Sequence, residues 1–363
     1  MSIRIMHAAD FHLDSPFAGL SGEQAKLRRR ESRFLPQRLA DYVNQNDIQV
    51  VLLAGDLFDG DAVYRETAEQ LAGALASMRA RVFISPGNHD YYSRHSFYAS
   101  YELPDNVHVF RSGAVERVEL PELSCAVYGA AFTSPTQETS LLEGFSAPDD
   151  GMLHLMVLHA ELGASVSRYD PITREQIAAS RLDYLALGHL HSFDGVHTAG
   201  GTAYAYSGCT EGRGFDECGE KGFLCGSVDR EQVDIRFVPF SMRRYHSLKA
   251  DVTDKDPETA LLEIMPETAL SDLCRIAFVG ESDEYGVDIK TLTEEFSRRF
   301  YSLTLNDETH IRRDVWDKAQ EDSLRGLFLR ELRKRYDAAG DGERTEIERA
   351  ARFGLAALDK RDL

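Results

Sequence analysis

Residues 3–12 read IRIMHAADFH, a short apolar run that is followed closely by an aspartate and a histidine. The run is almost continuously hydrophobic, which is typical of a strand that is covered on both faces. Asp10 and His12 are two positions apart, so both side chains leave the end of such a strand on the same side and could hold one ion together. Taken alone, this pair is weak evidence, because an ordinary polar loop has the same residues.

Four more apolar runs in the first two thirds of the chain have the same form. The five runs are Ile3–Met6, Val50–Leu53, Val82–Ile84, Leu153–Leu158 and Tyr184–Leu187. Helical patterns at residues 22–44 and 66–78 lie between some of them, which indicates a layered α/β sandwich. Polar residues follow every run, and the carboxyl ends of strands are where α/β sheets bind ligands. In chain order these residues are His12, Asp56, Asn88, His159, and the pair His189 and His191.

The character of the chain changes after about residue 240. We predict a layered α/β domain over residues 1–240, a smaller α+β capping domain over 241–310 and a helical tail over 311–363. The predicted strands of the smaller domain are Arg244–Val252, Cys274–Val279 and Ser302–Leu305, with helices at Pro257–Ile264 and Ile289–Phe300. The tail is strongly charged and should form helices at Trp316–Tyr336 and Glu343–Leu358.

Composition narrows the functional classes. The formal net charge is -19, whereas a protein that grips nucleic acid mainly through its phosphates should be basic. A local basic run could still contact nucleic acid, although a solvated helix face is the simpler interpretation. Its residues are Lys26, Arg28, Arg29, Arg30 and Arg33. Five cysteines without a CxxC pair argue against a disulfide framework or a structural zinc site. No segment is apolar for long enough to span a bilayer and no signal-peptide pattern precedes Ile3, so we expect a cytoplasmic protein.

The polar segments match the needs of phosphate-ester hydrolysis by two cations. Gly55 allows a tight turn, which leaves Asp56 at the strand end as a natural bridging carboxylate. Asn88 offers a neutral oxygen ligand, and His89 beside it could protonate the leaving group. Asp59 is suitably placed in sequence to orient that imidazole. Imidazole and carboxylate together suit Mn²⁺, Fe or Zn²⁺.

The later histidines complete the set. His159 follows a hydrophobic run, and His189 and His191 repeat the two-apart spacing of the first segment, so each of this pair could serve one ion. A single histidine beyond a strand is usually structural. Four histidines and two aspartates at such strand ends instead indicate a reactive site.

In this order, the motifs D-x-H, G-D-x-x-D, G-N-H-D, a strand-end histidine and G-H-x-H resemble the calcineurin-like metallophosphoesterase superfamily over about residues 1–240. The sequences of residues 55–59, 87–90 and 207–223 are similar to those of the SbcD-type DNA repair exonucleases. Residues 7–17 are especially similar to the YhaO-like branch. The resemblance implies the αββα type of sandwich.

The resemblance also implies roles for the residues. One metal would be held by Asp10, His12, Asp56 and His191, and the other by Asp56, Asn88, His159 and His189. His89 would be the catalytic histidine with Asp59 as its partner, and the usual ions are two Mn²⁺. The substrate would be DNA, and an SbcC-type coiled-coil ATPase would dock on the C-terminal helices. A homodimer is compatible with the family.

Two other interpretations remain open from the residues. The same site could act on small phosphodiesters or phosphomonoesters, such as cyclic nucleotides, or on phosphoproteins. The chain could also be a scaffold with a silent site, although every ligand position is present. The terminal helices could pack only on their own domain.

Overall fold

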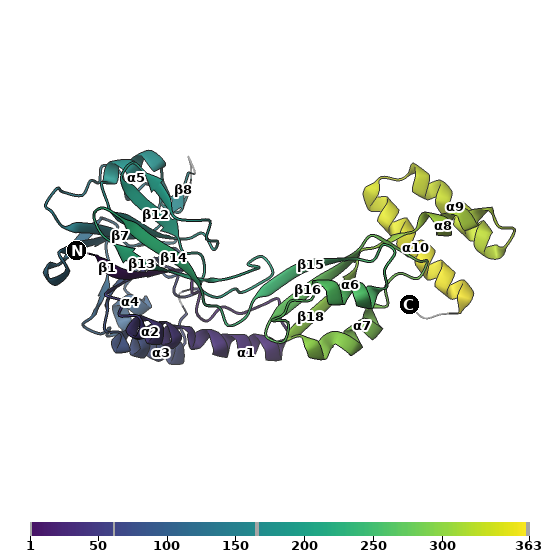
Figure 1. Cartoon of the computed structure of the whole chain (residues 1–363), viewed down its shortest axis with the longest axis horizontal. Coiled ribbons are helices and arrows are strands. Elements are labelled where there is room, and N and C mark those ends of the chain that lie inside the picture. The colour runs from purple at the N-terminus through teal and green to yellow at the C-terminus, as the bar shows by residue number, and fades with distance from the viewer. Residues whose placement is uncertain (1, 61, 164–166, 361–363) are drawn as a thin grey trace. The chain divides into compact units, whose positions relative to one another are not determined.

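The computed structural model describes residues 2–60, 62–163 and 167–360. The chain divides into two units, Met1–Met242 and Arg243–Leu363 (Figure 1). The first unit contains the predicted phosphoesterase domain. The segments 241–310 and 311–363, which the sequence analysis separates, both fall almost entirely in the second unit.

The described part of the first unit is built on two sheets of six strands each. The first sheet contains β1 (Ile3–Ala8), β2 (Val50–Leu53), β3 (Arg81–Ile84), β4 (Val107–Val109), β13 (Gly222–Val228) and β14 (Val233–Pro239). The second contains β5 (Glu116–Leu120), β6 (Cys125–Gly129), β7 (Leu153–His159), β10 (Tyr184–Gly188), β11 (His197–Ala199) and β12 (Thr202–Tyr206). Their orders are β14-β13-β1-β2-β3-β4 and β11-β12-β10-β7-β6-β5, with parallel strands at both centres. All five predicted strands are present.

The two sheets pack face to face and helices cover their outer faces, which confirms the layered sandwich. The side chains between the sheets include Ile5 and Leu52 from the first sheet and Val157 and Ala186 from the second. Outside the first sheet lie α2 (Leu35–Gln45) and α3 (Arg65–Ser77), and outside the second lies α5 (Arg174–Ser180). Smaller elements are α4 (Phe97–Ser100), β8 (Glu161–Leu162) and β9 (Pro171–Ile172).

The long helix predicted at residues 22–44 is two helices. α1 (Gly22–Arg33) ends at Phe34, and α2 follows directly with Pro36 in its first turn. Proline has no backbone N–H to donate and is favoured in the first turn of a helix. The apolar periodicity continues across the break, which is why the pattern alone joined the two.

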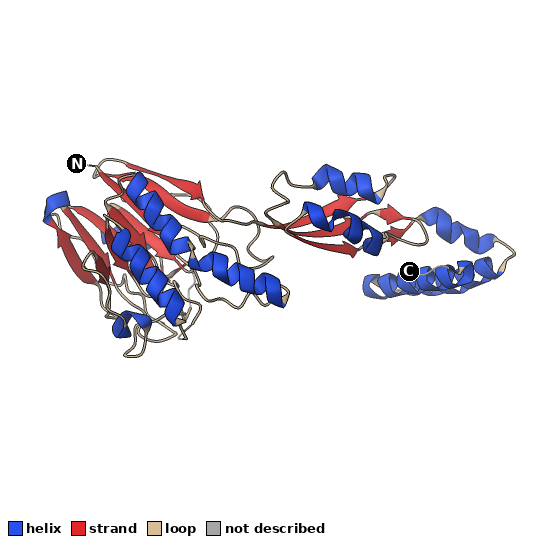
Figure 2. Cartoon of the chain, turned by 90° about the horizontal axis from the view of Figure 1, so that it is seen from below, coloured by secondary structure: helices blue, strands red, loops and turns tan. Residues whose placement is uncertain are grey.

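The second unit contains a parallel sheet with helices between its strands (Figure 2). The strands β15 (Tyr245–Asp251), β16 (Leu273–Val279) and β18 (Ser302–Asp307) lie side by side in that order. α6 (Pro257–Ile264) and α7 (Ile289–Phe296) pack their apolar residues on the sheet. β17 (Glu281–Ser282) pairs with β19 (His310–Ile311). The predicted strands and helices of this region are present.

The helical tail begins with α8 (Arg313–Asp317), and α9 (Leu324–Ala338) and α10 (Asp341–Asp359) follow. The single helix predicted at Trp316–Tyr336 is therefore interrupted. Ser323 caps α9 by accepting a hydrogen bond from the amide of Gly326 at 3.0 Å, and Ser, Thr, Asn and Asp at such a position favour a helix start over a continuing helix. In the described residues, no helix is long and apolar enough to cross a membrane.

One buried carboxyl group in the first unit is only partly hydrogen-bonded. Asp170 is inaccessible to solvent, and its Oδ1 accepts a hydrogen bond from the amide of Leu141 at 2.7 Å. Its Oδ2 has no hydrogen-bond partner among the described residues. Burial raises the pKa of Asp170 to about 7, although the hydrogen bond from Leu141 opposes this.

This pKa predicts a stability that falls as pH rises. Between about pH 4 and pH 7 the folded chain keeps the proton that the unfolded chain has lost, so raising the pH through this window favours unfolding. Asp170→Asn has no proton to lose. Its free energy of unfolding relative to wild type should therefore increase by about 2 kcal/mol from pH 5 to pH 8 in urea denaturation. A difference that stays constant over this range would contradict the assignment.

Candidate metal centre

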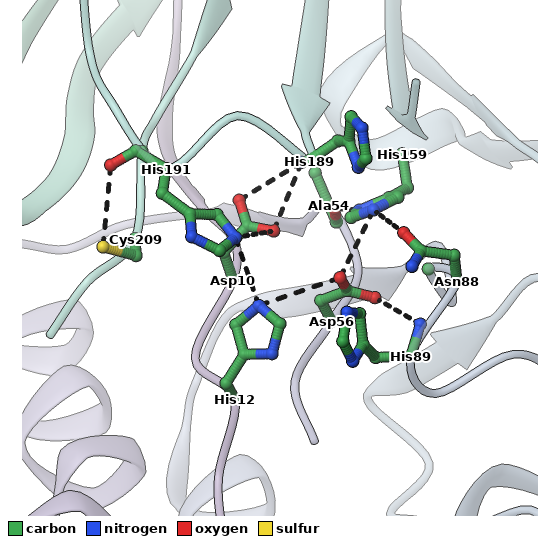
Figure 3. Close-up of polar contacts among 12 residues, drawn as sticks. Asp10, His12, Ala54, Asp56, Asn88, His89, His159, His189, His191 and Cys209 are labelled. Carbon is green, nitrogen blue, oxygen red and sulfur yellow. Dashed lines mark hydrogen bonds and ion pairs between the residues drawn. The ribbon is translucent and has the colours of Figure 1, made fainter. Parts of the chain in front are cut away.

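The polar residues predicted at strand ends meet at one edge of the sandwich (Figure 3). Asp10 and His12 follow β1, Asp56 follows β2, and Asn88 and His89 follow β3, all in the first sheet. His159 ends β7, and His189 and His191 follow β10, in the second sheet. The site thus takes residues from both sheets.

A hydrogen-bonded histidine joins the two sheets in the core. His7 lies on β1 and is fully buried. Its Nε2 donates to the carbonyl of Leu187 at 3.1 Å, which makes Nδ1 the acceptor of the Tyr184 hydroxyl at 2.9 Å. Burial lowers the pKa of His7 to about 3, so the ring is neutral. These bonds hold β1 against β10, the two strands that precede Asp10 and His191.

The backbone at the site is strained. Asp10, His12, Asp56 and His189 all have positive φ, at 54°, 44°, 52° and 104°. A residue other than glycine in this region costs about 1–3 kcal/mol and persists only where its surroundings impose it. Here the amides of Asp10 and His12 donate to the carbonyls of Gly55 and Asp56 at 3.0 and 2.9 Å. Four such residues at one edge indicate a functional site.

Two glycines allow the close approach of the segments. Gly55 has a φ of +86°. Gly188 lies so close to β2 that a Cβ there would stand 1.9 Å from the carbonyl oxygen of Ala54. A side chain at Gly188 would therefore push the two sheets apart at the site.

Asp56 stands between two groups of donor atoms. Its Oδ2 is 3.8 Å from His12 Nε2 on one side and 3.5 Å from His159 Nε2 on the other. Beyond His159, the Oδ1 of Asn88 is 2.9 Å from the same Nε2. One carboxylate is thus shared by both groups, as a bridging ligand would be.

The other side of the site gathers Asp10, His12 and His191. Nε2 of His12 and Nε2 of His191 are 3.2 Å apart, and Nε2 of His191 is 3.9 Å from Asp10 Oδ1. One ligand atom from each of these three residues lies within 4.8 Å of the others. The same holds for Asp10, Asp56 and His159.

The hydrogen bonds on the far side of the rings fix the tautomers. Nδ1 of His159 donates to the carbonyl of Ala54 at 2.9 Å. Nδ1 of His12 is 3.1 Å from Asp59 Oδ1, and Nδ1 of His191 is 2.7 Å from Glu217 Oε1. Because carbonyls and ionised carboxylates only accept, each Nδ1 carries the proton and each Nε2 turns an unshared electron pair into the site. Such a convergence of electron pairs suits a cation.

The ionisation of the site points the same way. Burial raises the pKa of Asp10 well above its usual range, and the neighbouring carboxylate of Asp56 adds to this. Burial also raises the pKa of Asp56, although His12 and His89 oppose it. Burial lowers the pKa of His12, His159 and His189 to about 4, so these rings are neutral near pH 7. Buried carboxylates that favour a positive neighbour, beside neutral imidazoles, form a donor set that fits divalent metal ions.

His189 and His89 lie at the margins of this set. The ring of His189 packs 5.1 Å from the ring of His159, and its amide donates to both carboxylate oxygens of Asp10 at 3.2 Å. His89 is solvent-exposed, with its ring 4.8 Å from that of His12, and its amide donates to Asp56 Oδ1 at 2.9 Å.

The structure lacks the predicted contact between the Asp59 carboxylate and the ring of His89 among its described contacts. Nδ1 of His89 is 3.3 Å from the backbone carbonyl of Asp59. The Asp59 carboxylate instead contacts His12, and the guanidinium of Arg213 at 2.9 Å. Sequence spacing showed that Asp59 is near the site, but the competing cation comes from a segment more than 150 residues away.

Three supporting carboxyl and guanidinium groups carried no assigned role in the sequence analysis. Asp90 is buried, and its carboxylate accepts hydrogen bonds from the amides of Asp56, Leu57 and Gly87 at 3.2, 2.7 and 2.8 Å. It therefore ties the turns after β2 and β3 together. Arg213 and Glu217 were part of the resemblance, but nothing in their spacing indicated contact with His191.

The comparisons with known proteins agree with this geometry. The family model of the calcineurin-like phosphoesterases matches residues 3–193. The chain is also similar to the uncharacterized metallophosphoesterase YhaO of Bacillus subtilis (strain 168), at 28% identity over 340 residues. That alignment covers 88% of this chain and 81% of the relative.

Because Asp56 lies between both groups of donors, we predict that substituting it weakens metal binding at both positions. Asp56→Asn should lower the affinity for both metal ions at least about tenfold, because a neutral amide replaces the shared charge. Metal content after gel filtration, measured by mass spectrometry, tests this. In EDTA the variant should melt no lower than wild type, since a buried carboxylate with a raised pKa has been removed.

The exposed Asp47 provides the control, and Asp47→Asn should leave the metal content unchanged. Retention of two tightly bound ions in Asp56→Asn would exclude the shared-ligand arrangement.

Proposed function

Because the chain belongs to the calcineurin-like phosphoesterase family and is therefore a metal-dependent hydrolase, we propose that it hydrolyses phosphodiester bonds in DNA. It would act as the nuclease subunit of a complex that repairs double-strand breaks. The observation that carries the phosphodiesterase chemistry is the convergence of Asp10, His12, Asp56, His159 and His191 with an exposed His89 beside them.

In this proposal the donor atoms hold two ions, with Mn²⁺ as the expected metal. The ions would activate water and neutralise charge on the phosphoryl oxygens. Asp56 would serve both ions, Asp10, His12 and His191 would complete one position, and Asn88, His159 and His189 would complete the other. The ring of His189 lies beside that of His159, with the two ring centroids 5.1 Å apart.

His89 is the proposed general acid. Its Nδ1 faces the carbonyl of Asp59, so Nδ1 carries a proton and Nε2 is left to exchange one with the substrate. The amide of His89 is bonded to Asp56, which fixes the backbone next to the bridging carboxylate. The imidazole can thus protonate the departing oxygen of the ester.

Two features support a polymeric substrate over a small ester. The chain carries a second unit and a helical tail, which a minimal hydrolase of small esters does not need. A groove of about 540 Å³ between α1 and α3 is lined by four basic side chains, two glutamates, Leu27, Phe34 and Gln70, and one of the glutamates, Glu66, pairs with Arg33 at 2.6 Å. The basic residues are Lys26, Arg29, Arg30 and Arg33. Such a groove suits a phosphate backbone.

Arg28 does not belong to this basic surface. Its side chain is fully buried and pairs with Glu31 at 2.8 Å and Glu211 at 2.7 Å. Since the whole chain has a net charge of -19, a partner would supply much of the positive charge that DNA binding needs.

We propose an SbcC-type coiled-coil ATPase as that partner, docked on the tail. Large apolar side chains stand exposed on α9 and α10: Leu324 is 69% exposed, Leu327 57% and Phe353 65%. Leu324 and Leu327 are three positions apart and so lie on one face of α9. Exposed apolar side chains on one helix face suit a helical partner. The homodimer and the cytoplasmic location stay predictions.

The substrate assay separates the proposal from its main alternative. With Mn²⁺, the chain together with its ATPase should degrade linear duplex DNA. Brisk turnover of bis-p-nitrophenyl phosphate without any DNA cleavage would instead favour a phosphoesterase for small substrates. A chain that purifies without metal and hydrolyses neither would be a scaffold with a silent site.

For the general acid, His89→Ala should lower kcat for DNA by about 10²–10⁴-fold, because the leaving oxygen loses its proton donor. Bound metal should remain at the wild-type level, as measured by mass spectrometry. The control His197→Ala changes a surface histidine that pairs with Asp194, and its activity should equal that of wild type. Unchanged kcat in His89→Ala would exclude this role.

For the docking surface, Leu327→Glu and Phe353→Glu should each weaken binding of the ATPase at least about tenfold, since a charge then faces an apolar contact. Binding of the ATPase to the full chain can be measured by isothermal titration calorimetry. Leu270→Glu is a matched control in the same unit, because Leu270 is 74% exposed and lies outside the tail helices. If all three variants bind the ATPase as tightly as wild type, the partner docks elsewhere.

A further inference from the structure

Two of the histidines proposed as metal ligands are each held from behind by a carboxylate. Nδ1 of His12 donates to Asp59 Oδ1 at 3.1 Å, and Nδ1 of His191 donates to Glu217 Oε1 at 2.7 Å. A carboxylate in this position fixes both the tautomer and the direction of the ring. Glu217 is almost fully buried, with 5% of its side chain exposed.

Arg213 joins the two carboxylates. Its Nη1 is 2.9 Å from Asp59 Oδ1 and its Nη2 is 2.8 Å from Glu217 Oε1. Its own backbone amide donates to Glu217 Oε2 at 2.7 Å. The planar guanidinium therefore sets the distance between the two acceptors, which a flexible ammonium group would not do.

Nη2 of Arg213 also lies 3.2 Å from Nδ1 of His191. Both of these nitrogens are donors when Nδ1 keeps its proton and donates it to Glu217. The 2.7 Å contact with Glu217 is the shorter one, so we assign the proton on Nδ1 to that bond. Glu217 then accepts from the histidine and the arginine together.

The support is confined to one side of the site. Among the residues that the structure describes, no carboxylate accepts from Nδ1 of His159, which donates instead to the carbonyl of Ala54 at 2.9 Å. Backbone rather than a side chain thus holds the ring on the other side. The rings on the two sides of Asp56 are therefore held by different parts of the chain.

We propose that Arg213 is a positioning residue that holds Asp59 and Glu217, and through them His12 and His191, so that it sets the affinity of one of the two metal positions. That position is the one with Asp10, His12, Asp56 and His191. The inference rests on the proposed two-metal site but not on the identity of the substrate.

A simple charge argument predicts the opposite result. Removing a cation next to a metal site should strengthen metal binding, because one source of repulsion is lost. Positioning predicts weaker binding, by about 10–100-fold for a supporting residue. Arg213→Lys separates the two effects, since it keeps the charge and loses the planar fork. On the charge argument it should bind metal as wild type does, and on the positioning argument it should bind weakly.

The test measures Mn²⁺ binding to the metal-stripped full chain by isothermal titration calorimetry. Wild type should bind two ions. Arg213→Gln and Arg213→Lys should each bind one ion with unchanged affinity and the other about 10–100-fold more weakly. At two equivalents of Mn²⁺, electron paramagnetic resonance should show a spin-coupled pair in wild type and isolated Mn²⁺ in the variants.

Arg117→Gln is the matched control, because Arg117 is a part-exposed arginine that pairs with Asp150 at 2.5 Å outside the metal centre. It should bind both ions as wild type does. If Arg213→Gln does not fold, as judged by circular dichroism, Arg213→Lys and Glu217→Gln carry the test, and both should lose affinity at one position.

Three outcomes would overturn the inference. Wild-type affinity at both positions in Arg213→Gln and Arg213→Lys would reject positioning while leaving the two-metal site intact. Unchanged metal binding with a raised KM would make Arg213 a substrate contact instead. Failure of the wild-type chain to bind two ions would reject the metal centre itself.

Discussion

The structure depends on how it accommodates the buried carboxylate of Asp56. This side chain is 2% exposed and lies within 4 Å of Nε2 of both His12 and His159. A carboxylate buried in this way is unfavourable unless a positive charge or hydrogen bonds stabilise it. The turns after β1, β2, β3 and β10 and the end of β7 all meet at this group. The metal centre and the meeting of the two sheets are therefore one structural feature.

The backbone of the site is locally strained, and hydrogen bonds from the surrounding structure stabilise the strained conformation. Asp10, His12, Asp56 and His189 have left-handed backbone conformations that are unfavourable for residues of these types. Asp90 offsets part of the cost of this strain by accepting hydrogen bonds from three backbone amides of the adjoining turns. The hydrogen bonds of His7 join β1 to β10. The rigid core positions side chains that would scatter in a loop.

The chain combines this site with a second unit, for whose tail helices we propose a role in partner binding. The two units have separate cores. The first has its core between and around the two sheets, and the second has one apolar cluster under α6 and α7 and another among the tail helices. In the proposed function, both the acidity of the chain and the exposed apolar side chains of α9 and α10 call for a binding partner. A partner that docks on the tail would contribute the positive charge that the chain lacks.

The order of strands and strand-end residues could be predicted from the sequence, because local apolar runs define buried strands and their carboxyl ends gather polar groups. The five strands, the layered sandwich and the closeness of Asp56, His159 and His191 follow from that pattern. The break at Phe34 was missed because the apolar periodicity continues through it. The start of α9 after Ser323 was missed because the same helix-like composition lies on both sides.

The contacts of single side chains were beyond prediction. Sequence spacing placed Asp59 near His89, yet its carboxylate contacts His12 and Arg213, since the guanidinium arrives from a distant loop and attracts it. Glu217 and Asp90 likewise gain their roles only when separate segments meet. Local patterns specify strands and turns, whereas the pairing of charges across more than a hundred residues depends on how the two sheets pack.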